Sequence, residues 1–392
     1  MKMIIKNFVV IKEAIYEPKW FNVIIGEQTS GKSLIVKLDY FFKEIVFEEL
    51  FISIIKQYVK TKFIENIKKR FFKYFNKNLV LNSAFEIEYY YNEDFFIKFY
   101  KNKNSLKIET SKIFDNYRNN LKREFKKYAN DENKLSEKLI NIQDEISEKF
   151  NYVNNTFIPA GRSFFANIDT NIFTILADNG KIDPFLIEFG KELEFTKFIL
   201  PKNENLNFEN FEKILKAKVF LDEKSEFFLN MNDTKFDLIY ASSAQQELLP
   251  IIITILFKEK RNIFVEEPEA HLFPSTQKNL IELLTTMAYK NNFTSLTITT
   301  HSPYIITALN NLILASEVNI PKNSSLYYLK KIAIPIDKIT AYSLENYKLK
   351  NILNKEENLI DGYNIDKISD EFAEVFDNLL EYMNNNKALK ND

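Results

Sequence analysis

The sequence predicts an α/β fold organised around a phosphate-binding loop. Residues 26–33 read GEQTSGKS between an apolar run at 21–25 and a helix-like segment that begins at Leu34. Two further apolar runs end abruptly in polar side chains: the run from Asn262 ends in two glutamates, and the run from Ser295 ends in a histidine. Ligands bind beyond the carboxyl ends of the strands in an open α/β sheet. We therefore expect these three segments to meet at one site.

The bulk composition is that of a globular protein with a sizeable core. The chain has 392 residues, is 45% hydrophobic and carries a formal net charge of -1, which argues against a strongly basic protein that coats DNA. It contains no cysteine, so disulfides, cysteine-bound zinc and a thiol nucleophile are excluded. Neither a membrane span nor a secretion signal is apparent. We expect a cytoplasmic protein that does not engage a membrane.

The loop has the spacing G-x-x-x-x-G-K-S, which suits phosphate binding. Its two glycines permit a tight turn whose backbone N–H groups point at phosphate oxygens, and the helix that follows adds the positive end of its dipole. Lys32 is expected to reach the β- and γ-phosphates and Ser33 to ligate Mg²⁺. The alternative is an ordinary Gly/Ser turn before an amphipathic helix. The loop predicts a phosphate-bearing nucleotide and Mg²⁺ as ligands, and the predicted cofactor-binding residues are Gly26, Glu27, Gln28, Thr29, Ser30, Gly31, Lys32 and Ser33.

A long insertion is predicted to follow the first part of the core, which spans residues 1–44. Residues 56–78 are basic and aromatic; they could contact nucleic acid or an acidic partner, or they could form a solvated lysine-rich helix face. Alternation of apolar and polar residues then predicts antiparallel strands, and residues 111–150 predict either a short helical arm or a helix pair packed on the body. We therefore expect a helical and antiparallel-β subdomain with a short helical arm at 45–156.

The run from Asn262 has the layout of a Walker B strand, because it ends in Glu266 and Glu267. Phosphoryl transfer to water requires one carboxylate near Mg²⁺ and a second that orients or deprotonates the attacking water. We assign Glu266 to the metal and Glu267 to the water. The alternative is two solvated glutamates in a turn.

The third segment is a β-rich run that ends in His301, followed by a Ser-Pro pair suited to begin a helix. Only one other histidine exists in the chain, His271, and it follows the acidic pair. About twenty residues before the acidic pair, Ser242 or Ser243 is expected to cap a helix whose N–H groups can hold an anion.

In this order the loop, the Ser/Gln segment, the acidic strand end and the strand-end histidine resemble the ABC-type ATPases of the SMC, RecF and OLD group. EEPEAHLFP at 266–274, followed by TTHSP at 299–303, is most similar to the OLD-like ATPases, which often serve in bacterial anti-phage defence. The resemblance covers residues 1–44 and 157–345. It implies an ABC-type core with a mixed sheet flanked by helices, and it leaves residues 346–392 as a C-terminal helical tail.

The resemblance also implies roles for individual residues and an assembly. It places His271 in a D-loop and makes His301 the sensor of the γ-phosphate. It implies a homodimer or higher homo-oligomer in which two copies sandwich two ATP molecules. Each signature motif, ASSAQ at 241–245, would then face the partner's ATP. The implied signature residues are Ser242, Ser243 and Gln245.

The sequence departs from the family pattern at a few positions. Ser243 and Ala244 stand where transporters have two glycines, and Glu266 replaces the usual aspartate. The family's Q-loop glutamine has no clear counterpart; Arg162 in FIPAGRS is a candidate residue beside the site. The OLD nucleases carry a TOPRIM domain, but the segment after His301 lacks the glycine-flanked acidic cluster of such a domain, so no nuclease domain is expected in this chain.

The leading functional hypothesis is an ATPase with Lys32, Glu267 and His301 as catalytic residues. Its ATP-driven dimerisation would act as a sensor or regulator of a separately encoded effector, a nuclease or toxin, in anti-phage defence. One alternative is a DNA repair or recombination ATPase of the RecF or SMC kind that contacts duplex DNA through residues 56–78. Another is a scaffold in which ATP is structural.

Overall fold

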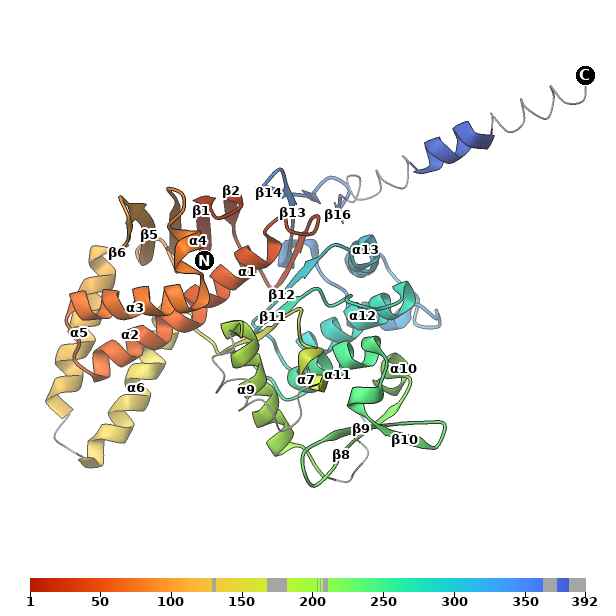
Figure 1. The fold of residues 1–392 in the computed structure, drawn as a ribbon, viewed down its shortest axis with the longest axis horizontal. Helices are drawn as coiled ribbons and strands as arrows, with labels where there is room; N and C mark the ends of the chain where they lie inside the picture. The colour runs from red at the N-terminus through yellow and green to blue at the C-terminus, as the bar shows by residue number, and fades with distance from the viewer. Residues whose placement is uncertain are drawn as a thin grey trace, which may run out of the picture.

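The computed structural model describes residues 1–128, 132–167, 182–202, 204, 206, 211–361 and 372–380, and Figure 1 labels its elements. Within these residues an eleven-stranded sheet has the order β6-β5-β4-β1-β2-β14-β13-β3-β12-β11-β7. Its parallel part pairs β13 with β3, β3 with β12, β12 with β11 and β11 with β7. The strands of this part are β3 (Phe21–Ile25), β7 (Asn155–Ile158), β11 (Asn262–Glu266), β12 (Ser295–Thr300) and β13 (Ile339–Glu345). The predicted α/β class with a mixed sheet is confirmed.

The parallel strands are buried on both faces, because helices cover each side. Every residue of β3, β11 and β12 is buried. Alternate side chains enter separate cores: Val23 and Ile25 pack in one cluster and Ile24 packs in the other. The first core also holds the helices that follow the downstream motifs, and the second holds the helix that follows the loop. The loop is therefore fixed from both sides of the sheet.

The other half of the sheet is largely antiparallel. Its strands are β1 (Lys2–Phe8), β2 (Ile11–Tyr16), β4 (Glu86–Tyr90), β5 (Phe96–Asn102), β6 (Ser105–Thr110) and β14 (Lys348–Asn351). Strands β4 to β6 are antiparallel, as expected. Because β4 pairs with β1, they extend the main sheet.

The helices of the N-terminal half begin at the loop and end in a helix pair. Helix α1 (Lys32–Tyr40), a π-helical turn η1 (Phe41–Ile45) and α2 (Val46–Ile55) follow one another without an intervening loop. Helices α3 (Lys60–Tyr74) and α4 (Lys77–Val80) come next. The predicted pair is α5 (Lys112–Tyr128) and α6 (Glu132–Phe150), and α5 packs against α2 (Figure 1).

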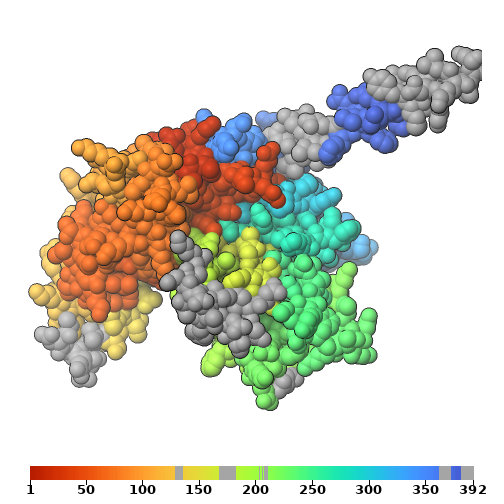
Figure 2. Space-filling model, viewed as in Figure 1, coloured from red at the N-terminus to blue at the C-terminus, as the bar shows by residue number. Residues whose placement is uncertain are grey.

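The C-terminal half surrounds the parallel strands with helices. They are α7 (Phe164–Asn167), α9 (Pro184–Ile199), α10 (Phe211–Leu215), α11 (Ser243–Leu256), α12 (Pro274–Lys290) and α13 (Pro303–Glu317). A second sheet contains β8 (Lys218–Leu221), β9 (Phe227–Met231) and β10 (Thr234–Asp237). Short 3₁₀ turns are η2 (Leu238–Tyr240), η3 (Tyr327–Lys331) and η4 (Ile336–Lys338). Figure 2 shows this half, largely green and cyan, beside the red and orange N-terminal half.

The predicted C-terminal tail begins with strands. Besides β14, it contains β15 (Leu353–Asn354) and β16 (Leu359–Ile360), and residues 372–380 are helical. The first strand forms because β14 pairs antiparallel with β13. Residues 362–371 and 381–392 of the predicted tail lie outside the described residues. In the described part of the chain, none of the helices combines the length and the apolar character that crossing a bilayer would require.

Candidate functional site

Two positions in the loop between β3 and α1 leave little room for a side chain. Gly31 has φ 109°, in the left-handed region, and a Cβ added there would lie 2.9 Å from Cγ2 of Val10. A Cβ added at Gly26 would lie 3.0 Å from the carbonyl oxygen of Leu344. The two glycines of the motif therefore allow the turn that the spacing predicted.

Lys32 is folded back over this loop. Its Nζ donates hydrogen bonds to the carbonyl oxygens of Gly26 and Glu27, each at 2.7 Å. Burial lowers the pKa of Lys32, and the charges of Glu267 and Glu269 oppose that shift. The amine thus faces the acidic strand end, and a phosphate in the loop would offer it a charged partner in place of two carbonyls.

Glu266 and Ser33 lie together, as the metal assignment requires. The carboxylate of Glu266 is buried, and its Oε2 accepts a hydrogen bond from the N–H of Ala160 at 3.3 Å. Burial raises the pKa of Glu266, whereas the charge of Lys37 and the Ser33 side chain lower it. Its Oε1 has no hydrogen-bond partner among the described residues. A buried carboxylate oxygen without a partner, beside a hydroxyl, is a donor set that fits Mg²⁺.

Glu267 differs from Glu266 in exposure and backbone conformation. Its side chain is partly exposed, and its Oε1 lies 4.0 Å from Nδ1 of His301. Its φ is 41°, and its N–H donates to the carbonyl oxygen of Thr299 at 3.0 Å. Because a left-handed glutamate is strained, this hydrogen bond helps to hold the turn. The two adjacent acids therefore have separate environments, which suits separate roles.

Glu269 is a site residue that the sequence reasoning missed. Its Oε1 accepts hydrogen bonds from the Thr300 hydroxyl at 2.6 Å and from the backbone N–H of His301 at 2.8 Å. The same oxygen lies 3.2 Å from Nδ1 of His301. Its signal in the sequence was a third carboxylate within the EEPE segment. Glu269 joins the Walker B segment to the strand-end histidine.

The histidine segment has the predicted strand-to-helix geometry. Ser302 caps α13, because its Oγ accepts from the N–H of Tyr304 at 3.2 Å, and it also donates to Oε1 of Gln277 at 2.6 Å. The side chain of His301 is 38% exposed and is open to a ligand. His271 is also exposed, with φ 60°; its place in a D-loop stays a prediction.

The Ser/Gln segment forms the predicted helix start. Ser242 caps α11, and Gln245 completes a capping box, with its Oε1 accepting from the Ser242 N–H at 3.1 Å. Ser242 and Ser243 are exposed. In the described part of the chain, no hydrogen bond or ion pair links Ser242, Ser243 or Gln245 to the loop at 26–33. Their contact with nucleotide therefore stays a prediction that requires a second copy.

Arg162 lies directly behind the acidic pair. Its Nη1 donates to the carbonyl oxygen of Glu266 at 2.8 Å, and its Nη2 donates to that of Glu267 at 3.0 Å. This fully buried arginine follows β7, whose end meets the Walker B strand. The structure thus brings together residues of the loop, the acidic pair, His301 and Arg162.

Acidic side chains pair with some of the cations in the basic segment at 56–78. On α3, Lys69 pairs with Glu65 at 3.1 Å, and Arg70 pairs with Glu49 at 3.4 Å and with Glu48. Lys60 pairs with an acid of α5. These ion pairs leave fewer free cations for nucleic acid than the sequence suggested.

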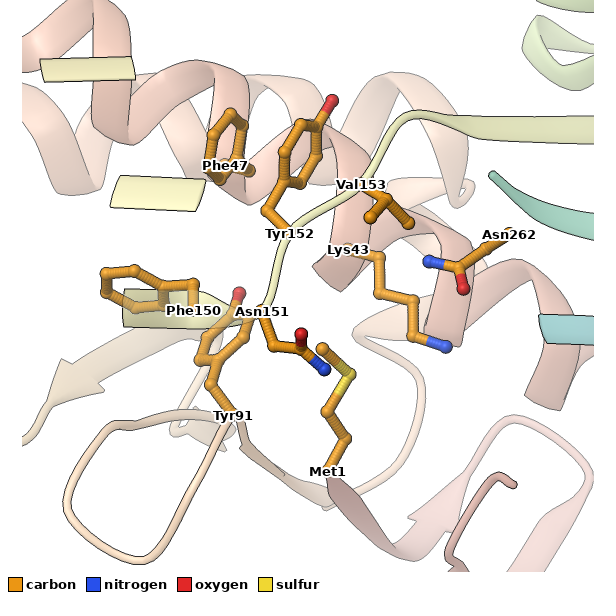
Figure 3. Close-up of a pocket in the computed structure, with 9 residues that line it drawn as sticks. All are labelled: Met1, Lys43, Phe47, Tyr91, Phe150, Asn151, Tyr152, Val153 and Asn262. Atoms are coloured by element: carbon orange, nitrogen blue, oxygen red, sulfur yellow. The ribbon is translucent and has the colours of Figure 1, made fainter. Parts of the chain in front are cut away.

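A small cavity exists elsewhere, beside η1 and the end of α6 (Figure 3). Its volume is about 10 Å³, about the space that one water occupies. The rings of Phe47 and Tyr152 stack at its wall. It shares no lining residue with the loop at 26–33 and is too small for a nucleotide. The lining residues are Met1, Lys43, Phe47, Tyr91, Phe150, Asn151, Tyr152, Val153 and Asn262.

The mixed sheet, the phosphate loop after β3 and the acidic end of β11 define an ABC-type P-loop ATPase fold. Residues 1–306 match the family described as "AAA ATPase domain", and the chain belongs to that family. The matched range includes the segment 45–156. Among curated proteins, no sequence is significantly similar to the chain.

Several solved SMC heads are similar to the chain at low identity. One is an SMC head bound to the C-winged helix domain of ScpA, with 12% identity and a TM-score of 0.42 over 91% of this chain and 99% of that chain. Another is the SMC head domain from Thermotoga maritima, with 10% identity and a TM-score of 0.38 over 90% and 97%. A third, from Pyrococcus furiosus, has an extended coiled coil and is bound to the C-terminal domain of ScpA; its identity is 12% and its TM-score 0.42 over 95% and 98%.

Proposed function

We propose that the chain binds ATP–Mg²⁺ at residues 26–33 and hydrolyses ATP at a site completed by a second copy. The observation that carries the proposal is the contrast within the acidic pair. Glu266 is buried beside Ser33 with one oxygen lacking a partner, whereas Glu267 is partly exposed and faces Lys32 and His301. This contrast supports a metal-binding role for Glu266 and a water-orienting role for Glu267.

The residues would divide the chemistry as follows. Ser33 and Glu266 would hold Mg²⁺, which when bound neutralises phosphate charge. Lys32 would bind the β- and γ-phosphates. Glu267 would orient the attacking water and accept its proton, and His301, held by Glu269, would contact the γ-phosphate.

Exposed aromatic side chains support a homodimer or higher homo-oligomer. Tyr240 precedes the signature segment, Phe273 follows His271, and Tyr304 follows His301; their exposed fractions are 77%, 75% and 52%. Aromatic residues are enriched in protein interfaces, and these three lie close in sequence to the motifs that would meet the second copy. In the proposed dimer, Ser242, Ser243 and Gln245 of one copy contact the ATP of the other.

The biological role that we propose is a cytoplasmic sensor or regulator in anti-phage defence, acting on a separately encoded nuclease or toxin. It rests on the resemblance of EEPEAHLFP and TTHSP to the OLD-like ATPases. The proposed division of the chain remains 1–44, 45–156, 157–345 and 346–392. An adjacent nuclease or toxin gene would support this role.

The alternative is a RecF- or SMC-like ATPase that binds duplex DNA through residues 56–78. Salt-sensitive DNA binding that is lost on charge reversal of Lys68, Lys69 and Arg70 would favour it. The ion pairs of Lys69 and Arg70 are the reason that we rank it second.

Two variants test the proposed ATPase. Lys32→Ala should abolish nucleotide binding, and Glu267→Gln should bind ATP but trap an ATP-bound dimer. Lys69→Ala, an exposed lysine on α3, is the matched control and should behave like the wild type. Binding of a fluorescent ATP analogue, phosphate release and light scattering provide the measurements. Unimpaired hydrolysis in both variants would refute the assignment.

A further inference from the structure

Arg162 connects two parts of the candidate site that are far apart in the sequence. On one side its guanidinium bonds the carbonyl oxygens of Glu266 and Glu267. On the other side its Nε donates to the carbonyl oxygen of Glu247 at 3.0 Å and lies 3.1 Å from Oε2 of that residue. Glu247 lies on α11, the helix that Ser242 caps. One side chain thus joins the signature helix to the catalytic turn.

The burial of this arginine makes the connection rigid. Arg162 is 0% exposed, and Glu247 is 3% exposed. A buried guanidinium is tolerated only when its N–H groups are bonded and its charge is balanced. Pro159 supplies a further carbonyl acceptor at 3.1 Å. The planar, forked donors of arginine can satisfy these acceptors together, and the single ammonium of lysine cannot.

The turn that Arg162 holds is strained. Glu267 has φ 41°, which a residue with a side chain adopts only when its surroundings enforce it. Its carbonyl oxygen accepts from Arg162, and its N–H donates to Thr299. A displacement of the guanidinium would therefore alter the position of the Glu267 carboxylate.

The helix is well suited to produce such a displacement. Glu247 follows Ser242 by five residues, a rise of about 7.5 Å along α11. Because the intervening residues belong to one hydrogen-bonded helix with a capping box, movement of its exposed start reaches Glu247.

We infer that Arg162 is a positioning residue that couples the signature helix to the Glu266–Glu267 turn. Engagement of Ser242 and Ser243 with the ATP of a second copy then adjusts the catalytic carboxylate of the same chain. The two ATP sites of a dimer communicate through this side chain. The inference rests on the proposed function, because it requires two copies that share nucleotide.

Hydrogen exchange of the full chain tests this coupling without requiring turnover. The protein is compared with and without a non-hydrolysable ATP analogue and Mg²⁺, as the wild type, Arg162→Lys, Ser243→Arg and the double variant. Ser243→Arg places a bulky side chain at the exposed helix start and blocks its engagement. Arg118→Lys is the matched control: Arg118 is 1% exposed and bonds the carbonyl oxygen of Tyr58 at 2.9 Å, within the helices beyond the site.

In the wild type, the analogue should protect residues 26–33, 242–249 and 264–270. Ser243→Arg should reduce protection at 264–270 by about tenfold in exchange rate, which is ~1.4 kcal/mol. Arg162→Lys should reduce it equally while protection at 26–33 persists, and the double variant should show no further loss. If Arg162→Lys does not fold, Glu247→Gln, which keeps the helix carbonyl, tests the same connection.

Several results would overturn the inference. Additive losses of protection in the double variant would show that Arg162 does not transmit the effect. The same conclusion would follow if Ser243→Arg or Arg162→Lys alone left the protection of 264–270 at the wild-type level. If Arg118→Lys lost as much protection at 264–270 as Arg162→Lys, the effect of Arg162 would be a general stabilisation of the fold. Absence of protection at 26–33 in the wild type would refute the nucleotide site itself, and the coupling with it.

Discussion

The Nδ1 atom of His301 lies 3.2 Å from Oε1 of Glu269, an oxygen that also accepts the backbone N–H of the same histidine. This double contact fixes the ring relative to its own backbone and directs Nε2 away from the carboxylate. Because its ring orientation is already fixed, His301 can present Nε2 to a ligand without losing further side-chain conformational entropy. Glu269 therefore belongs to the site although it would not touch the nucleotide.

Replacing Glu269 by glutamine should lower ATP turnover without abolishing nucleotide binding. The amide retains an acceptor oxygen but loses the charge that holds Nδ1 of His301, so we expect a turnover loss of about tenfold to a hundredfold. Steady-state phosphate release and equilibrium ATP binding measure the two quantities. A Glu269→Gln protein with wild-type turnover would show that the orientation of His301 does not depend on this carboxylate.

Removing the Ser33 hydroxyl should weaken the metal-dependent part of ATP binding. In the proposed site, Ser33 and the unpartnered oxygen of Glu266 would hold Mg²⁺, so Ser33→Ala should reduce ATP affinity by about tenfold, or ~1.4 kcal/mol, when Mg²⁺ is present. When a chelator removes Mg²⁺, the ATP affinity of Ser33→Ala should equal that of the wild type. Equal losses with and without Mg²⁺ would mean that Ser33 contacts phosphate instead.

A charge at Phe273 should disrupt the proposed dimer. Phe273 is 75% exposed, so Phe273→Glu should not disturb the monomer, whereas burying a carboxylate in an interface opposes association. Analytical ultracentrifugation with ATP, in the Glu267→Gln background, measures the dimer fraction. Ile140→Glu, at a 60% exposed position on α6, is the control that should leave the dimer intact. If Phe273→Glu and Ile140→Glu dimerise equally well, Phe273 does not lie in the dimer interface.

Glu44 should make stability depend on pH. Burial raises its pKa to about 7, against the opposing hydrogen bonds from Asn155 and Tyr152. Because the folded pKa lies above the ordinary value of 4.5, the contribution of Glu44 is complete below pH 4.5 and is lost as pH rises through 7. The total loss should be at most about 3 kcal/mol. Glu44→Gln should remove this dependence when urea unfolding is compared at pH 5 and pH 8, and an identical dependence in both proteins would contradict the assignment.

The sequence predicted the elements whose signals are local. The loop glycines, the apolar run before Glu266 and the Ser-Pro pair after His301 each report their conformation within a few residues, and all three appear as expected. The pairing of β4 with β1 was not predictable in this way. An alternating strand reports which of its faces is buried but not which strand it pairs with, so the extension of the main sheet by β4, β5 and β6 was not predicted.

The same reason explains why Glu269 was missed and why the contacts of Arg162, named only as a candidate beside the site, were not predicted. Glu269 was visible as a third acid, but only the fold shows that its carboxylate contacts Thr300 and His301. Arg162 lies about a hundred residues before Glu266, and its partners are mostly backbone carbonyls, which leave no signature in side-chain identity. Contacts between distant segments through main-chain atoms are therefore the part of a site that sequence patterns report least.

The continuous helical run from α1 through η1 to α2 has a mechanical consequence. It begins at Lys32 in the phosphate loop and ends at Ile55, a length of about 36 Å at 1.5 Å per residue, and its far end packs on α5. No loop interrupts this run, so it can move as one rigid element. A small tilt of α1 at the phosphate loop would therefore produce a larger displacement where α2 meets the α5–α6 pair.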